Sequence, residues 1–157
     1  MNRDGQHDFD FELGTWATHL RRLRRPLTGS TDWVEYDGTS VVRPILGGLA
    51  NMVELDVSGP AGRIVGLSLR LYRPETRDWS LNFASMANGL LGVPAIGRFE
   101  DGRGEFVSDE ELDGRPILSR FVISEISADS CHFDQAFSAD GGATWESNWI
   151  AVDTRVR

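Results

Sequence analysis

Hydrophobic and polar residues alternate along most of this chain, with the period of two that is typical of half-buried β-strands. The alternation is strongest in residues 65–72, where valine and leucine at odd positions face glycine, serine, arginine and tyrosine at even ones. The same period returns in residues 115–126, 130–138 and 144–156, which are separated by Ser-Ala-Asp-Ser and Ala-Asp-Gly-Gly. We therefore predict that the last third of the chain is a β-meander with tight turns.

Further strands are predicted upstream, each bounded by glycine, proline or aspartate: residues 14–25, 31–46, 49–57, 65–72, 79–83, 96–100 and 105–110. Asp37-Gly38 lies inside the second of these runs, either as a hairpin turn or as a bulge that bends one long strand; we favour the bulge. About ten strands with almost no helical period indicate an all-β fold, a barrel or a sandwich. We expect a single antiparallel up-and-down β-barrel.

Two segments depart from the strand pattern. Residues 7–13 fit a short helical turn across one barrel end, although they also fit a strand. Residues 85–95 place four large apolar side chains among glycine and proline, which is typical of a lid over a cavity or of a loop packed on the barrel.

Composition narrows the class of protein. A chain of 157 residues is large enough for one domain, residues 1–157, with its own core. No apolar run approaches the length of about 20 residues that crosses a bilayer, and the N-terminus lacks the apolar segment of a secretory signal. We expect a cytoplasmic protein with no membrane partner.

Charge and residue types exclude several kinds of chemistry. The net charge of −8 disfavours a nucleic-acid partner. The chain has no lysine, so Schiff-base chemistry and a Walker A loop are absent. Its three histidines lack metal-ligand spacing, and no nucleophile motif is present. We expect no metal and no cofactor, and we expect Cys131, the single cysteine, to be a small core residue.

Aromatic residues dominate the predicted interior. In residues 144–156, Trp145 and Trp149 share a strand face with Asp153 and Arg155, and we expect this face to point inward. Large side chains either fill a barrel of this size or line a cavity; we favour the cavity. The residues predicted to line it are Trp33, Arg43, Trp79, Phe83, Phe121, Phe133, Gln135, Phe137, Trp145 and Trp149.

Gly14-Thr15-Trp16, taken together with Arg155 near the end of the chain, resembles the calycin signature of lipocalins and fatty-acid-binding proteins. The resemblance implies that Gly14, Trp16 and Arg155 close the barrel, with the arginine stacked on the indole at its base. The ordered stretches 7–16, 71–79, 97–104 and 137–145 are also similar to a bacterial family of lipocalin-like barrels known as a domain of unknown function.

One neighbour in that superfamily binds haem through a histidine on a late strand. This chain has no histidine after residue 133, and His132 is out of phase with Phe133, so we expect His132 to point outward and haem not to bind.

Several charged residues lie inside strand patterns. Arg22 shares a face with Trp16, which would suit an anionic ligand head group, whereas Arg120 is out of phase with its apolar neighbours and should point outward. Glu35, Glu54 and Asp134 are candidate general bases if they face a dry cavity.

Three functions remain open from the sequence. The first is the binding of a small hydrophobic molecule, with or without an anionic group. The second is a cofactor-free enzyme of the cyclase or isomerase type that uses the same cavity, so whether the protein is an enzyme stays undecided. The third is a filled barrel that acts as an interaction domain. A strand edge left by incomplete closure would favour a homodimer.

Overall fold

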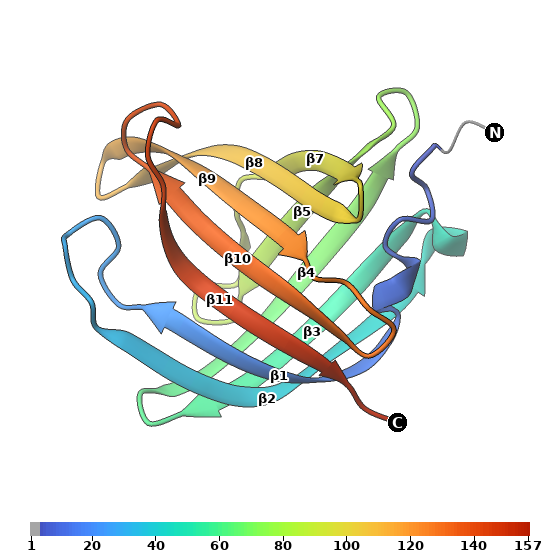
Figure 1. Ribbon diagram of the computed structural model, residues 1–157, viewed down its shortest axis with the longest axis horizontal. Helices are drawn as coiled ribbons and strands as arrows, with labels where there is room; N and C mark the ends of the chain where they lie inside the picture. Colours follow the sequence, from blue (N-terminus) through green and yellow to red (C-terminus); the bar gives the residue numbers. More distant parts are fainter. Residues whose placement is uncertain (1–3) are drawn as a thin grey trace.

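The computed structural model describes residues 4–157 and is a closed antiparallel β-barrel (Figure 1). Each long strand pairs with its neighbours in the chain, β1 pairs with β11, and a pairing of β4 with β5 closes the sheet. The predicted up-and-down barrel of about ten strands is therefore confirmed, with a two-residue strand added at one edge. The strands are β1 (Gly14–Leu23), β2 (Trp33–Ile45), β3 (Ala50–Gly59), β4 (Gly62–Arg73), β5 (Asp78–Ser85), β6 (Leu90–Leu91), β7 (Ala95–Glu100), β8 (Arg103–Leu112), β9 (Arg115–Ser124), β10 (Ser130–Ser138) and β11 (Glu146–Arg155).

Helical structure in residues 4–157 is limited to two short 3-10 turns, η1 (Asp10–Glu12) and η2 (Leu46–Gly48). The first lies across one end of the barrel (Figure 1), so the helical reading of the N-terminal segment is confirmed over the strand reading. No helix in this part of the chain combines the length and the apolar character that a membrane span requires.

An aromatic plug fills the end of the barrel beneath η1. Phe9 is 2% exposed, and its ring centroid lies 4.9 Å from those of both Trp79 and Phe99 and 5.9 Å from that of Phe106. The indole nitrogen of Trp79 donates to the backbone oxygen of Gly5 at 3.0 Å. The N-terminal segment thus closes this end by hydrophobic packing and edge-to-face ring contacts.

The two ends of the chain meet beside this plug. Trp16 is fully buried and pairs with Arg155 across the β1–β11 ladder, and the guanidinium carbon of Arg155 lies 4.3 Å from the Trp16 ring centroid. Arg155 also donates to the backbone oxygens of Phe11, Leu13 and Ala128. Gly14 has φ +127°, and a Cβ there would lie 2.9 Å from Nη1 of Arg155, so the glycine leaves room for the guanidinium.

Strand β2 is continuous through Gly38, and both interpretations of Asp37-Gly38 are corrected. The pairing of β2 with β1 and with β3 passes through Gly38 with no shift in register, which excludes a hairpin and a bulge there. A Cβ at Gly38 would lie 2.0 Å from the carbonyl oxygen of Asp56. The glycine is present because the backbone of β3 crosses closely over it, which lets the sheet curve.

A register shift occurs instead between β10 and β11. Gln135 pairs with Trp149, whereas Ala136 pairs with Ser147, so Asn148 is the extra residue of a β-bulge. The bulge reverses which face the preceding residues occupy: Trp149, Ala151 and Asp153 point inward, but Trp145 and Ser147 point outward. The expected single inward face of residues 145–155 is therefore wrong for its first two members.

Candidate functional site

The half of the barrel beyond the plug is hollow. A pocket of about 350 Å³ lies between the polar groups next to η1 and the 85–95 segment, where Gly92 and Val93 border it. The interior is therefore solid at one end and open at the other. The two interpretations of the aromatic residues, a filled core and a lined cavity, each hold for one part of the barrel.

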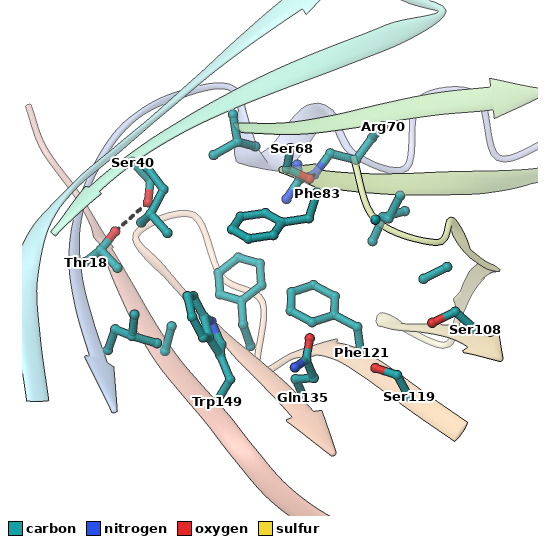
Figure 2. Close-up of a pocket in the computed structure, with 18 of the residues that line it drawn as sticks. Thr18, Ser40, Ser68, Arg70, Phe83, Ser108, Ser119, Phe121, Gln135 and Trp149 are labelled. Atoms are coloured by element: carbon teal, nitrogen blue, oxygen red, sulfur yellow. Dashed lines mark hydrogen bonds between the residues drawn. The ribbon is translucent and has the colours of Figure 1, made fainter. Parts of the chain in front are cut away.

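Aromatic side chains from four strands form the middle of the pocket (Figure 2). Phe121 of β9 stacks on Phe133 of β10 at a centroid distance of 5.8 Å. Phe83 of β5 meets Trp149 of β11 edge to face at 6.2 Å. Phe83 is 40% exposed, so part of this apolar surface faces solvent or the open pocket. Such a wall suits a flat apolar molecule.

Five of the ten residues predicted from the sequence border this pocket: Phe83, Phe121, Phe133, Gln135 and Trp149. Their role in ligand binding stays a prediction. They share inward positions on β5, β9, β10 and β11, where the alternation of side chains is regular.

The other five lie elsewhere. Trp33 and Arg43 are on the outer face of β2, where Trp33 stacks with Arg21 and Arg43 pairs with Glu54 at 3.0 Å. Trp145 also lies on the outer face, because of the β11 bulge. Its ring centroid is 4.2 Å from the guanidinium carbon of Arg120. Trp79 belongs to the plug. Phe137 is half-buried and does not border the pocket.

A hydroxyl and carboxyl chain crosses the floor of the pocket. The Thr18 hydroxyl donates to Oδ1 of Asp153 at 2.6 Å, and Ser40 therefore donates to Thr18, also at 2.6 Å. Asp153 is 3% exposed. Burial, reinforced by the negative charge of Glu12, raises the pKa of the Asp153 carboxyl to about 7.

A buried ion pair lies beside this chain. Arg70 of β4 and Glu12 of η1 are 4% and 1% exposed, and the guanidinium binds both carboxylate oxygens of Glu12. Arg70 also donates to Asn51 at 3.0 Å and to Ser68 at 3.1 Å, and it lies over the ring of Phe9. The charge of Arg70 is thus already neutralised within the protein.

The opposite wall carries a second polar group. The Ser108 hydroxyl donates to Glu110 at 2.6 Å, next to Ser119 of β9. Gln135 donates its amide to Asn148 at 2.9 Å, and Figure 2 shows its carboxamide oxygen directed into the pocket. The groups that this wall offers are mainly hydrogen-bond acceptors.

The carboxylates singled out from the sequence do not reach the pocket. Glu35 pairs with His19 at 3.3 Å, Glu54 pairs with Arg43, and Asp134 accepts from Ser147, all on the outer face. Arg22 is exposed and does not border the pocket. Arg120 and His132 point outward as expected, the latter 2.9 Å from Glu125.

Apart from Gln135, the polar groups that border the pocket were not proposed as functional from the sequence. One signal was present: Asp153 shares a face with Trp149 and Ala151, which the pattern placed inward. For Arg70 and Glu12 no such signal exists, because the contact joins residues 58 positions apart. Cys131 is buried as predicted, and burial raises the pKa of its thiol.

Comparison with known proteins gives the fold. No family model matches this sequence, and a search of curated proteins found no significant match. Among solved structures, Rv2717c from M. tuberculosis is similar over the full length of both chains, with a TM-score of 0.63 at 14% identity. The S-type phycobiliprotein lyase CPES from Guillardia theta also has a TM-score of 0.63, at 12% identity, with 97% of this chain and 92% of that chain covered.

A barrel named EF1p2_mFAP2b, solved bound to DFHBI, has a TM-score of 0.54 at 11% identity, and the match covers 97% of this chain and 99% of that chain. These likenesses agree with the barrel fold described above. At such low identity they carry the fold and no assignment of activity.

Proposed function

We propose that this protein binds a small, largely hydrophobic molecule inside the barrel. The observation that carries the proposal is the pocket itself: about 350 Å³ of space walled by Phe83, Phe121, Phe133 and Trp149 and reached from one end of the barrel. A packed core would leave no void of this size, because protein interiors are filled to nearly crystalline density.

The comparison supports the same conclusion. A barrel of similar architecture was solved with DFHBI bound. Here the aromatic wall supplies apolar contact, and the polar groups at the two sides would orient the ligand.

Trp149 provides a direct test, since it borders the pocket whereas Trp33 lies on the outer face. A library of lipophilic molecules is screened by thermal shift and tryptophan fluorescence. A true ligand at a hundredfold excess over its Kd should stabilise the fold by about 2.7 kcal/mol. Its fluorescence change should be lost in Trp149→Phe, which keeps an aromatic wall, and retained in the matched control Trp33→Phe. The absence of any thermal shift across the library would refute the proposal.

A second candidate function is favoured by Asp153. A carboxyl with a pKa of about 7 that borders an apolar pocket is suited to general acid–base catalysis near neutral pH. The same screen distinguishes the two functions, because each ligand is recovered and analysed by mass spectrometry. Recovery of unchanged ligand favours a binding protein, whereas an isomer formed by the wild type and not by Asp153→Asn favours an enzyme.

A further inference from the structure

The pocket has an imbalance of charge. Its lining contains three carboxyl groups, Glu12, Glu110 and Asp153, and among the described residues Arg70 is the basic side chain that borders it. Arg70 is held by both oxygens of Glu12 and by Ser68 and Asn51. An anionic ligand would therefore find no free cation among the described residues, which argues against the anionic head group that the sequence left as one option.

Two of these carboxyls have no ion-pair partner among the described residues: Glu110, which is half-buried and accepts a hydrogen bond from Ser108, and Asp153, which is buried. Asp153 is therefore the buried carboxyl of the pocket that has no counter-ion. The charged and titratable groups around it are Glu12 of η1, Arg70 of β4 and Cys131 of β10. Glu12 and Arg70 neutralise each other, and Cys131 is an uncharged thiol. From β1, Asp153 meets the uncharged hydroxyl of Thr18.

The two oxygens of Asp153 differ in their surroundings. Oδ1 accepts from Thr18, whereas Oδ2 has no hydrogen-bond partner among residues 4–157 and is not a sealed buried atom. Since Asp153 borders the pocket and is 3% exposed overall, its free oxygen opens onto the pocket and not onto bulk solvent. A buried carboxylate in this position is stabilised by a cation or a hydrogen-bond donor.

We infer that the ligand is a cationic amphiphile, an apolar aromatic molecule with a protonated amine, and that Asp153 is its counter-ion. The inference rests on the proposed function and names the ligand class of that pocket. The apolar part would lie against Phe121, Phe133 and Trp149, and the ammonium group would donate to Oδ2 of Asp153. Gln135 and Glu110 add acceptors on the opposite wall.

The inference has a consequence for pH. Asp153 must be ionised to pair with an ammonium group, and its pKa in the empty pocket is about 7. Amine binding should therefore strengthen as the pH rises from 6 to 8 and should release protons to the solution below pH 7. The affinity of an uncharged apolar ligand should not follow this profile.

The test uses four probes that share one ring system: naphthylmethylamine, methylnaphthalene, naphthoate and acetonaphthone. Binding is measured by isothermal titration calorimetry at pH 6 and pH 8. At pH 8 the amine should bind most tightly and naphthoate least. Asp153→Asn should weaken amine binding by about tenfold or more and leave methylnaphthalene binding unchanged. The control Asp134→Asn removes the same charge from the outer face, where Asp134 accepts from Ser147, and should change neither affinity.

The outcomes are separable. If methylnaphthalene or acetonaphthone binds as tightly as the amine, or if Asp153→Asn binds the amine as well as the wild type does, the inference is wrong and the proposed function stands. If none of the four probes and no library molecule binds, both are wrong. Retained methylnaphthalene binding and an unaltered circular dichroism spectrum show that Asp153→Asn is folded.

Discussion

At the scale of single residues, the pocket floor places a carboxyl where solvation is poor. Asp153 keeps one hydrogen bond, from Thr18, and gains no cation, because Arg70 is committed to Glu12. Burial therefore raises its pKa to about 7, far above the ordinary aspartate value of 3.8. A buried carboxylate without a counter-ion lowers the free energy of unfolding at neutral pH. Such a loss of stability is typical of residues retained for function.

This arrangement predicts how stability depends on pH. Between about pH 4 and pH 7 the folded protein keeps a proton on Asp153 that the unfolded chain releases, so the contribution of this group to stability falls as the pH rises and is constant above that window. Asp153→Asn should therefore raise the free energy of unfolding by about 2–4 kcal/mol at pH 8 and by much less at pH 4. Urea unfolding of the variant and the wild type at pH 4 and pH 8 measures this difference in the free energy of unfolding. An equal effect at pH 4 and pH 8 would contradict the raised pKa.

At the scale of elements, curvature is set by close backbone contacts. Strand β2 bends past β3 with its register intact, and Gly38 permits this because the Asp56 carbonyl occupies the space of a Cβ. The bulge at Asn148 has a different effect, since it turns Trp145 out of the interior and toward Arg120. A single glycine thus permits the curvature of β2, and a single extra residue in β11 decides that Trp149 faces the pocket and Trp145 does not.

Gly38→Ala tests the first of these effects. The added methyl group would overlap the β3 backbone, so the strands must separate, and we expect the free energy of unfolding to fall by about 1–3 kcal/mol or more. The neighbouring Thr39→Ala, at an exposed position of the same strand, is the matched control and should cost less than about 1 kcal/mol. Comparable losses in the two variants would show that the close approach at Gly38 does not constrain the sheet.

At the scale of the whole molecule, the fold is a closed cylinder sealed at one end. Closure depends on contacts between the two ends of the chain: β1 with β11, Arg155 over Trp16, and Arg155 with the carbonyl oxygens of Phe11 and Leu13. The N-terminal plug and the last strand therefore stabilise each other.

We predict that Arg155→Ala lowers the free energy of unfolding by about 2–4 kcal/mol, because it removes a cation–π contact and several charge-assisted hydrogen bonds. Arg155→Lys keeps the positive charge but not the planar guanidinium group. Its free energy of unfolding should therefore lie between those of the alanine variant and the wild type. Backbone amide hydrogen exchange in residues 9–16 should be faster in Arg155→Ala than in the wild type. Amide exchange in β8 should change less. Unaltered exchange in residues 9–16 would mean that Arg155 does not hold the plug.

Much of this architecture could be predicted from the sequence, because alternation with a period of two is a local property. The strand at residues 130–138 has the predicted bounds, and the order of strands followed from their spacing. The five aromatic and amide side chains that border the pocket were also identified, since their strands are regular near those positions.

Other features were decided by the tertiary structure. Alternation in residues 65–72 defines two faces of β4 but does not say which one points inward, and the inward face proved to be the one with Ser68 and Arg70. The bulge at Asn148 depends on pairing with β10, and the pairing of Arg70 with Glu12 depends on η1 reaching across the barrel end.

The sequence by itself therefore determined the strands, their order and the barrel they form, because hydrophobic periodicity and turn residues act over a few positions. Only the tertiary structure decided which end of the interior is filled and which is hollow, and that a buried carboxyl, Asp153, borders the hollow part without a cation. The physical reason is that burial and charge pairing arise between strands distant in the chain, where local pattern carries no information.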